Sequence, residues 1–195
     1  GSLALYANTT GNSNTAIGKD VLKSNTTANS NTGVGLNSLE TNTTGHSNSA
    51  LGRDTLKANT TGESNVSVGY TALLTNTTGA TNVAVGNFSL KLNTTGDHNT
   101  ALGAGSLNEN TTGDYNVAVG RLTFRYNTSG TKNTVVGSLA GDTLTTGDNN
   151  TIIGSEADAS SATVDNEITL GNSNVATLRC NTQTISSLSD ARDKT

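Results

Sequence analysis

Residues that commonly bind metals are few in this chain, and their spacing does not bring them together. His46 and His98 occupy different positions of the 17-residue repeat described below and lie three repeats apart. Several acidic residues stand in the turn before a recurrent asparagine and resemble calcium-loop acids: Glu63, Asp97, Asp114 and Asp148. Because the same position also holds His46, Ala80 and Thr131, we interpret it as a solvated turn and predict neither a metal site nor a cofactor.

The sequence also lacks residue patterns that would indicate catalysis. The single cysteine, Cys180, excludes an intrachain disulfide framework and a zinc cluster. A polysaccharide depolymerase would need a cleft with paired carboxylates, and no two acidic residues are set apart from the repeat positions. We therefore predict that the chain is not an enzyme.

The composition excludes further classes of protein. The net charge of −4 argues against nucleic acid as a partner, since phosphates require a basic surface. No apolar run approaches the roughly 18 residues of a membrane span, so membrane insertion is not expected. Hydrophobic residues make up only 31% of the chain, a low content that is typical of disordered proteins. A disordered chain, however, should be rich in proline and charge, whereas here proline is absent and only 13% of the residues are charged. The few apolar residues must therefore be placed regularly. Gly1-Ser2 resembles a cloning scar, so we expect a fragment of a longer protein.

A strict 17-residue repeat organises the chain without one insertion or deletion. Each position of the repeat forms a column, named here by its member within residues 14–28, so the Asn14 column continues at Asn31 and Asn48. The recurrent residues of one coil are Asn14, Ile17, Gly18, Leu22, Asn25, Thr26 and Thr27. The last three belong to an Asn-Thr-Thr-Gly element that returns in most coils.

This period predicts an all-β fold, a parallel β-solenoid of about ten coils without an α-helix longer than a turn or two. Seventeen residues are too few for a helical repeat, which needs about 33 or more. Alternation puts Thr15 and Ile17 on one face of a short strand and Ala16 on the other, and we expect the large Ile17 column to form the core. A second strand is expected at 21–23. Asn and Thr columns about 4.8 Å apart should form hydrogen-bonded ladders, and ten coils should make a rod of roughly 48 Å.

The Ala16 column suggests association of chains. It holds small residues opposite the Ile17 column, including Ala16, Ala50, Ala84, Ala101 and Ala118. A solvated face should instead carry larger polar residues, so we predict that this column packs against a neighbouring chain in a homotrimer. One chain alone would bury only two or three large apolar side chains per coil, which makes it marginal.

Two resemblances to known families accompany this repeat. Asn-Thr-Ala-Ile-Gly-x-x-x-Leu at 14–22 resembles the head repeats of trimeric autotransporter adhesins, which implies a left-handed parallel β-roll of three chains. The Asn-Thr-Thr-Gly element is closer to solenoid repeats of phage-type tail fibres. The similarity covers about residues 1–175.

The end of the chain resembles a second tail-fibre feature. Residues 189–194 look like the Ser-Asp-x-x-x-Lys start of the intramolecular chaperone domain of phage tailspikes and fibres, which assists trimer formation and then cleaves itself off. The resemblance implies that Ser189 is the nucleophile and Lys194 the base, in a remnant that we expect to be inactive. We divide the chain into a solenoid (1–175), a trimerising cap or linker (176–188) and the chaperone remnant (189–195).

The predicted function is the structural shaft of a trimeric viral tail fibre, carried on the virion outside the cell. The positions after the Gly18 column vary, which is typical of a loop that tolerates substitution. Alternatively, the aromatic and arginine residues there, namely Tyr70, Phe88 and Arg121, form a receptor face for a host glycan or protein. An adhesin stalk on a bacterial surface is the alternative. From other classes, the threonine columns suit an ice-binding array, and the Asn-Thr-Thr elements match the glycosylation sequon.

Overall fold

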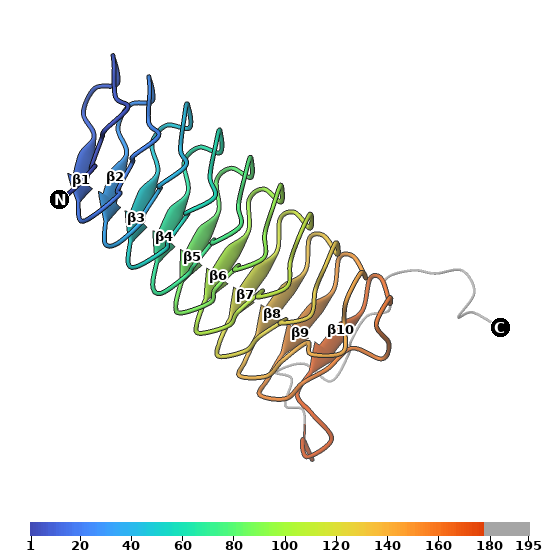
Figure 1. Ribbon diagram of the computed structural model, residues 1–195. Helices are drawn as coiled ribbons and strands as arrows, with labels where there is room; N and C mark the ends of the chain where they lie inside the picture. The colour runs from blue at the N-terminus through green and yellow to red at the C-terminus, as the bar shows by residue number, and fades with distance from the viewer. Residues whose placement is uncertain (178–195) are drawn as a thin grey trace.

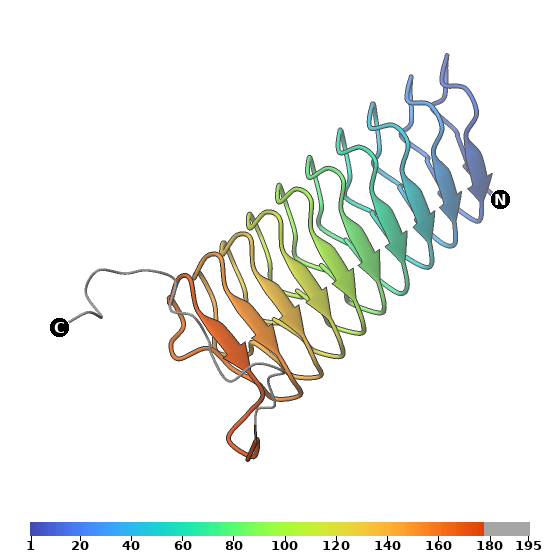
Figure 2. The same cartoon turned by 180° about the vertical axis from the view of Figure 1, so that it is seen from behind.

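The computed structural model describes residues 1–177 and shows a parallel β-solenoid in which each coil contributes one three-residue strand. The strands are β1 Thr15–Ile17, β2 Thr32–Val34, β3 Ser49–Leu51, β4 Val66–Val68, β5 Val83–Val85, β6 Thr100–Leu102, β7 Val117–Val119, β8 Thr134–Val136, β9 Thr151–Ile153 and β10 Ile168–Leu170. They stack in chain order into one ten-stranded sheet along a rod of about nine turns (Figures 1 and 2). The described residues contain no helix, so the predicted fold class is confirmed.

The register of the sheet follows the repeat without a slip. Each strand pairs in parallel with the residues 17 positions further on, as Thr15 pairs with Thr32 and Ile17 with Val34. The same step joins β9 to β10, where Leu170 pairs with Ile153. The members of each column therefore lie directly above one another along the rod.

The core lies on the opposite face of the strands from the one predicted. Ala50, Ala84, Ala101 and Ala118 are buried inside their own chain, where they pack against the Leu22 column. Ala16 in the first strand is partly buried against the same core. The prediction that the Ala16 column faces a neighbouring chain is therefore wrong for these residues. A 17-residue coil leaves little interior width, so small side chains fill the strand side of the core and leucines fill the other side.

Each coil has a single strand, so the second strand expected at 21–23 is also wrong. Asp20 has a φ of 56° and Leu22 a φ of 49°, and both values repeat along their columns. Left-handed residues at alternate positions cannot extend into a strand, because β backbone requires negative φ. The segment instead forms consecutive turns that bend Leu22 into the core, where it is fully buried.

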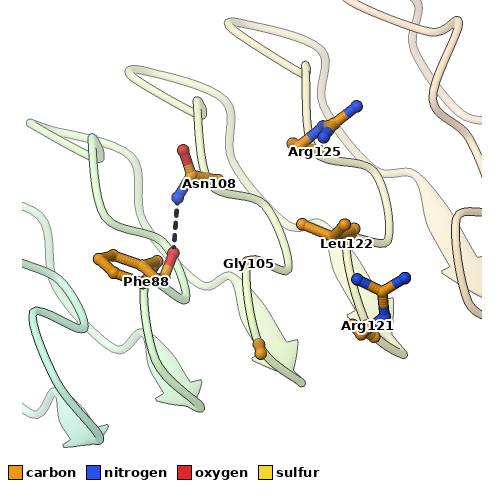
Figure 3. A pocket seen from close by; sticks show the side chains of 7 residues that line it. Phe88, Gly105, Asn108, Arg121, Leu122 and Arg125 are labelled. Carbon is orange, nitrogen blue, oxygen red and sulfur yellow. Dashed lines mark hydrogen bonds between the residues drawn. The ribbon is translucent and has the colours of Figure 1, made fainter.

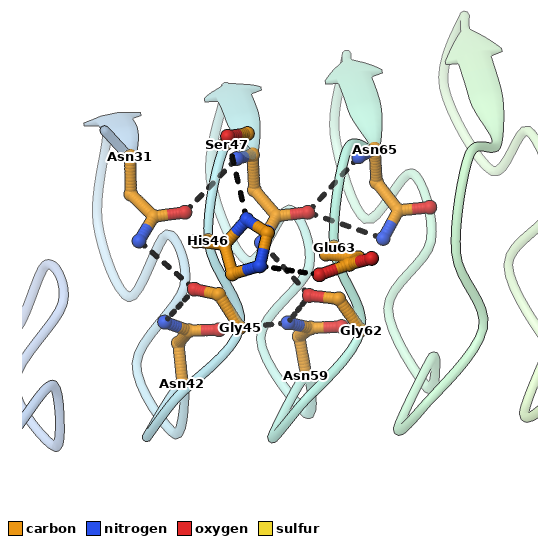
Figure 4. A network of polar contacts seen from close by, with 10 residues as sticks. Asn31, Asn42, Gly45, His46, Ser47, Asn59, Gly62, Glu63 and Asn65 are labelled. Carbon is orange, nitrogen blue, oxygen red and sulfur yellow. Dashed lines mark hydrogen bonds and ion pairs between the residues drawn. The ribbon is translucent and has the colours of Figure 1, made fainter. Parts of the chain in front are cut away.

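Two ladders of buried asparagines replace much of an ordinary apolar core (Figure 4). In the Asn25 column, Asn59 Nδ2 donates to Asn42 Oδ1 of the preceding coil at 2.8 Å. In the Asn14 column, Asn48 Oδ1 accepts the backbone N–H of Asn65 at 3.0 Å. The two ladders meet at Gly62, whose carbonyl accepts both Asn48 Nδ2 and Asn59 Nδ2 at 2.9 Å. The predicted asparagine ladders are therefore present, and they satisfy backbone groups that turns leave unpaired.

The threonine column forms a third ladder beside them. Thr60 Oγ1 donates to the carbonyl of Thr77 in the next coil at 3.0 Å, and Thr77 repeats the bond to Thr94. These hydroxyls are part of the coil-to-coil hydrogen bonding, which confirms the expected threonine ladder.

Glycine at the end of each strand is required by both conformation and space. Gly86 has a φ of 134°, and a Cβ there would lie 2.6 Å from the backbone C and O of Gly103. We expect Gly86→Ala to lower the free energy of unfolding by about 1–3 kcal/mol through backbone strain, with the steric overlap adding to this. Chemical denaturation checks this, with Ser138→Ala beside the equivalent Gly137 as the control expected within about 0.5 kcal/mol of the parent. Equal stability of the two variants would contradict the prediction.

Candidate interaction surface

An apolar stripe runs along the outer face of the sheet. The Ile17 column points away from the core, and several of its side chains are well exposed: Ile17 60%, Leu51 52%, Val85 38%, Leu102 37%, Ile153 44% and Leu170 49%. We name this column the outer stripe. The neighbouring Thr15 column, which faces the same way, adds Val66 at 38% and Ile168 at 72%.

Local geometry explains why large apolar residues occur at these outward positions. Side chains of a strand alternate between faces, so a buried Ala16 column requires the residues on either side of it to point outward. Parallel sheets are normally covered on both faces, and their strands are apolar throughout for that reason. Here the described residues cover only the inner face. A continuous exposed apolar surface of this kind is typical of a protein interaction site.

The candidate receptor face lies beside the outer stripe, on the turns that follow the strands. The rings of Tyr70 and Phe88 meet edge to face with centroids 5.5 Å apart. Arg53 lies 5.7 Å above Tyr70 and Lys91 lies 5.6 Å above Phe88, as cation–π pairs. Phe88 and Arg121 line one pocket (Figure 3). Because Tyr70 contacts Phe88, the three predicted residues lie along one side of the rod.

Cations and carboxylates are paired at the amino-terminal part of this face. Asp54 contacts Arg53 at 3.0 Å and Lys57 at 3.6 Å. Burial raises the pKa of Asp54, but hydrogen bonds from Asn37 and Arg53 and the charge of Lys57 together lower it below its usual value. The carboxylate therefore stays ionised and neutralises these cations.

Further along the rod, Arg125 has one ion-pair partner and, within residues 1–177, one buried nitrogen that stays without an acceptor. Arg125 binds Asp142 at 3.0 Å and stacks over the ring of Tyr126 at 4.0 Å. Burial raises the pKa of Asp142, although the charge of Arg125 opposes this, and Asp158 adds to the rise. Arg125 Nε is buried without an acceptor among the described residues.

The histidines and acidic residues considered as metal ligands do not form a common site in the described part of the chain. His46 pairs with Glu63, whereas His98 stacks on Tyr115 with ring centroids 4.8 Å apart. Within residues 1–177, no group of three or more His, Cys, Asp or Glu side chains could hold a metal ion. Ser189, Lys194 and Cys180 lie outside the described residues, as does all of the predicted cap except 176 and 177.

Two other interpretations of the Asn-Thr-Thr element meet physical obstacles. The asparagines of this column from Asn25 to Asn127 are fully buried in their ladder, so the amide nitrogens that a glycan would modify are inaccessible there. The hydroxyls of the Thr26 column donate to carbonyls of the next coil, as Thr26 Oγ1 does to Thr43 at 3.3 Å, which leaves them occupied. Only the outer Thr27 column could face ice.

Comparisons with known proteins give no family assignment. A scan against protein-family models, a search of curated proteins and a search of solved structures each found no match. Across residues 1–177, no helix has the length and hydropathy needed to cross a membrane.

Proposed function

We propose that this chain is the structural shaft of a homotrimeric tail fibre of phage type, carried on the virion outside the host cell. The observation that carries the proposal is the outer stripe, whose residues are exposed or half-buried on a single chain along all ten strands. Three rods with their stripes turned toward a common axis would bury this surface. In this arrangement the outer stripe, and not the buried Ala16 column, forms the contact between chains.

The energetics favour burial of the stripe. Complete burial of a Val, Leu or Ile side chain contributes about 1.5–3 kcal/mol, and the stripe offers one such residue in every coil. Identical chains in parallel would align these residues without a change of register. A closed rotational arrangement is the usual form of a soluble homo-oligomer. The resemblance of the repeat to trimeric adhesins and fibres supports three chains rather than two.

The tail-fibre assignment rests on the resemblance of the repeat and of the Ser-Asp-x-x-x-Lys end. A trimeric adhesin stalk on a bacterial surface shares the same architecture and is the alternative function. The domain content of the full-length gene product distinguishes them. A virion-attachment domain would favour the fibre, and a signal peptide would favour the adhesin.

Disulfide cross-linking tests the orientation of the chains. In a Cys180→Ser background, Leu102→Cys places one thiol on the outer stripe at the middle of the rod. If the stripes face a common axis, mild oxidation should link chains in pairs on a denaturing gel, because two thiols come close enough to bond. The third chain of each trimer should stay unlinked.

Thr95→Cys in the same background is the matched control, because Thr95 is exposed on a column away from the stripe. It should remain largely unlinked. Equal cross-linking of both variants, or none at Leu102→Cys, would contradict the proposed arrangement.

A further inference from the structure

A pocket interrupts the regular surface beside the outer stripe, where two neighbouring columns carry only Ala104 and Gly105. Its volume is about 260 Å³, and it is lined by Phe88, Ala104, Gly105, Asn108, Arg121, Leu122 and Arg125 (Figure 3). The Asp20 column carries Phe88 and Leu122 in the coils on either side of Gly105. A Cβ at Gly105 would lie 2.6 Å from Leu122 Cδ2, so the leucine leans over the space that the missing side chain leaves.

The lining combines apolar and cationic groups. Phe88 and Leu122 form apolar walls on the two sides of Gly105. Arg121 and Arg125 bring guanidinium groups from the next coil, and guanidinium binds planar carboxylates through paired hydrogen bonds. Asn108 Nδ2 donates to the carbonyl of Phe88 at 2.9 Å, which fixes that amide at the edge of the pocket.

The charge around the pocket is unbalanced in favour of anions. The Lys19, Asp20 and Lys23 columns of the coils from 86 to 125 contain Lys91, Arg121 and Arg125, and of these Arg125 is ion-paired at 3.0 Å with Asp142 of the next coil. The nearest acid in these coils along the chain is Glu109, one residue beyond the Lys23 column. Arg121 forms no ion pair within the described part of the chain, in contrast to Arg53 with Asp54.

We propose that this pocket binds a carboxylate-bearing saccharide. Phe88 and Leu122 suit the apolar C–H face of a sugar ring, while Arg121 binds its carboxylate. The volume suits one sugar residue with its substituents rather than a long oligosaccharide. This inference deepens the host-interaction part of the proposed function and names its ligand class, and each chain carries the whole site, so it does not depend on the number of chains.

Direct binding measurements test the proposal. The probes are 3′-sialyllactose and a hyaluronan tetrasaccharide, which carry carboxylates on different sugars, and lactose as the neutral comparison. Isothermal titration should show at least one acidic probe binding at least tenfold more tightly than lactose. Arg121→Ala should reduce that affinity at least tenfold. Ala104→Tyr should abolish it by filling the hollow, and the same column accepts a tyrosine at Tyr70.

Two matched variants separate the pocket from general effects. Arg53→Ala removes a cation from the same column as Arg121, and Ser155→Tyr places a tyrosine at an exposed position of that column, two coils from Arg121. Both should bind the acidic probe like the parent chain. The proposal is overturned if neither acidic probe binds more tightly than lactose, or if the pocket variants and their controls weaken binding equally. Light scattering on the same samples reports the association of chains separately.

Discussion

If the proposed trimer forms, the double substitution Leu51→Asp and Val85→Asp should separate it into single chains that keep their β-solenoid. Both residues belong to the outer stripe and are exposed on one chain, at 52% and 38%. A carboxylate there costs the single chain little, whereas burying it between chains without a partner costs several kcal/mol. We expect the dissociation constant to rise at least 100-fold. Light scattering measures the mass, and circular dichroism reports whether the β fold is retained.

The matched control is Thr61→Asp with Thr95→Asp. These threonines are exposed in the Thr27 column and, like Leu51 and Val85, lie two coils apart, so the added charge and its spacing are the same. The control should keep the mass of the parent. If the stripe variant stays as tight an oligomer as the control, the outer stripe is not the interface.

Removal of one buried asparagine should destabilise the coil more than removal of an exposed one. Asn82 is fully buried; its Oδ1 accepts the N–H of Asn99 at 2.9 Å and its Nδ2 donates to the carbonyl of Gly96 at 2.8 Å. Asn82→Ala leaves the N–H of Asn99 without an acceptor, whereas Gly96 keeps its bond from Asn93. We expect the free energy of unfolding to fall by about 2–4 kcal/mol, since an orphaned buried donor costs about 1–3 kcal/mol and a lost hydrogen bond about 1 kcal/mol.

Asn87→Ala provides the comparison. Asn87 Oδ1 also accepts a backbone N–H of the adjacent coil, that of Tyr70 at 3.0 Å, but Asn87 is exposed. Water can replace this acceptor, so the change should stay within about 0.5 kcal/mol. Urea denaturation of both variants measures the difference. Similar losses from the two would show that burial of the ladder is not what stabilises the coil.

The repeat predicts the architecture because it acts through local geometry. A constant step of 17 residues places identical side chains above one another, which yields the parallel register and the asparagine and threonine ladders. Alternation along the strand also separates Ala16 from Thr15 and Ile17 correctly. The repeat alone does not predict which of the two strand faces forms the core. The usual preference for large apolar residues in the core gives the wrong answer here, because a coil this narrow accepts alanine opposite Leu22.

Other features depend on contacts between coils that no single repeat displays. Leu22 lies in a left-handed turn with a φ of 49°, a conformation that leucine rarely adopts and that β propensity does not predict. The pocket arises where Gly105 follows Phe88 and precedes Leu122 in one column. Aligning the columns reveals the gap, but the lean of Leu122 into it requires the packed structure. The pairing of Tyr70 with Phe88, by contrast, follows from their neighbouring columns in successive coils.

The mass of the unaltered chain in solution tests the central proposal most directly. If three chains bury their outer stripes together, light scattering during size-exclusion chromatography should give three times the 19.7 kDa mass of one chain. This mass should persist on dilution to micromolar concentration, because a continuous apolar interface releases chains slowly. A mass of 19.7 kDa across the concentration range would contradict the account, since the stripe would then remain exposed to water.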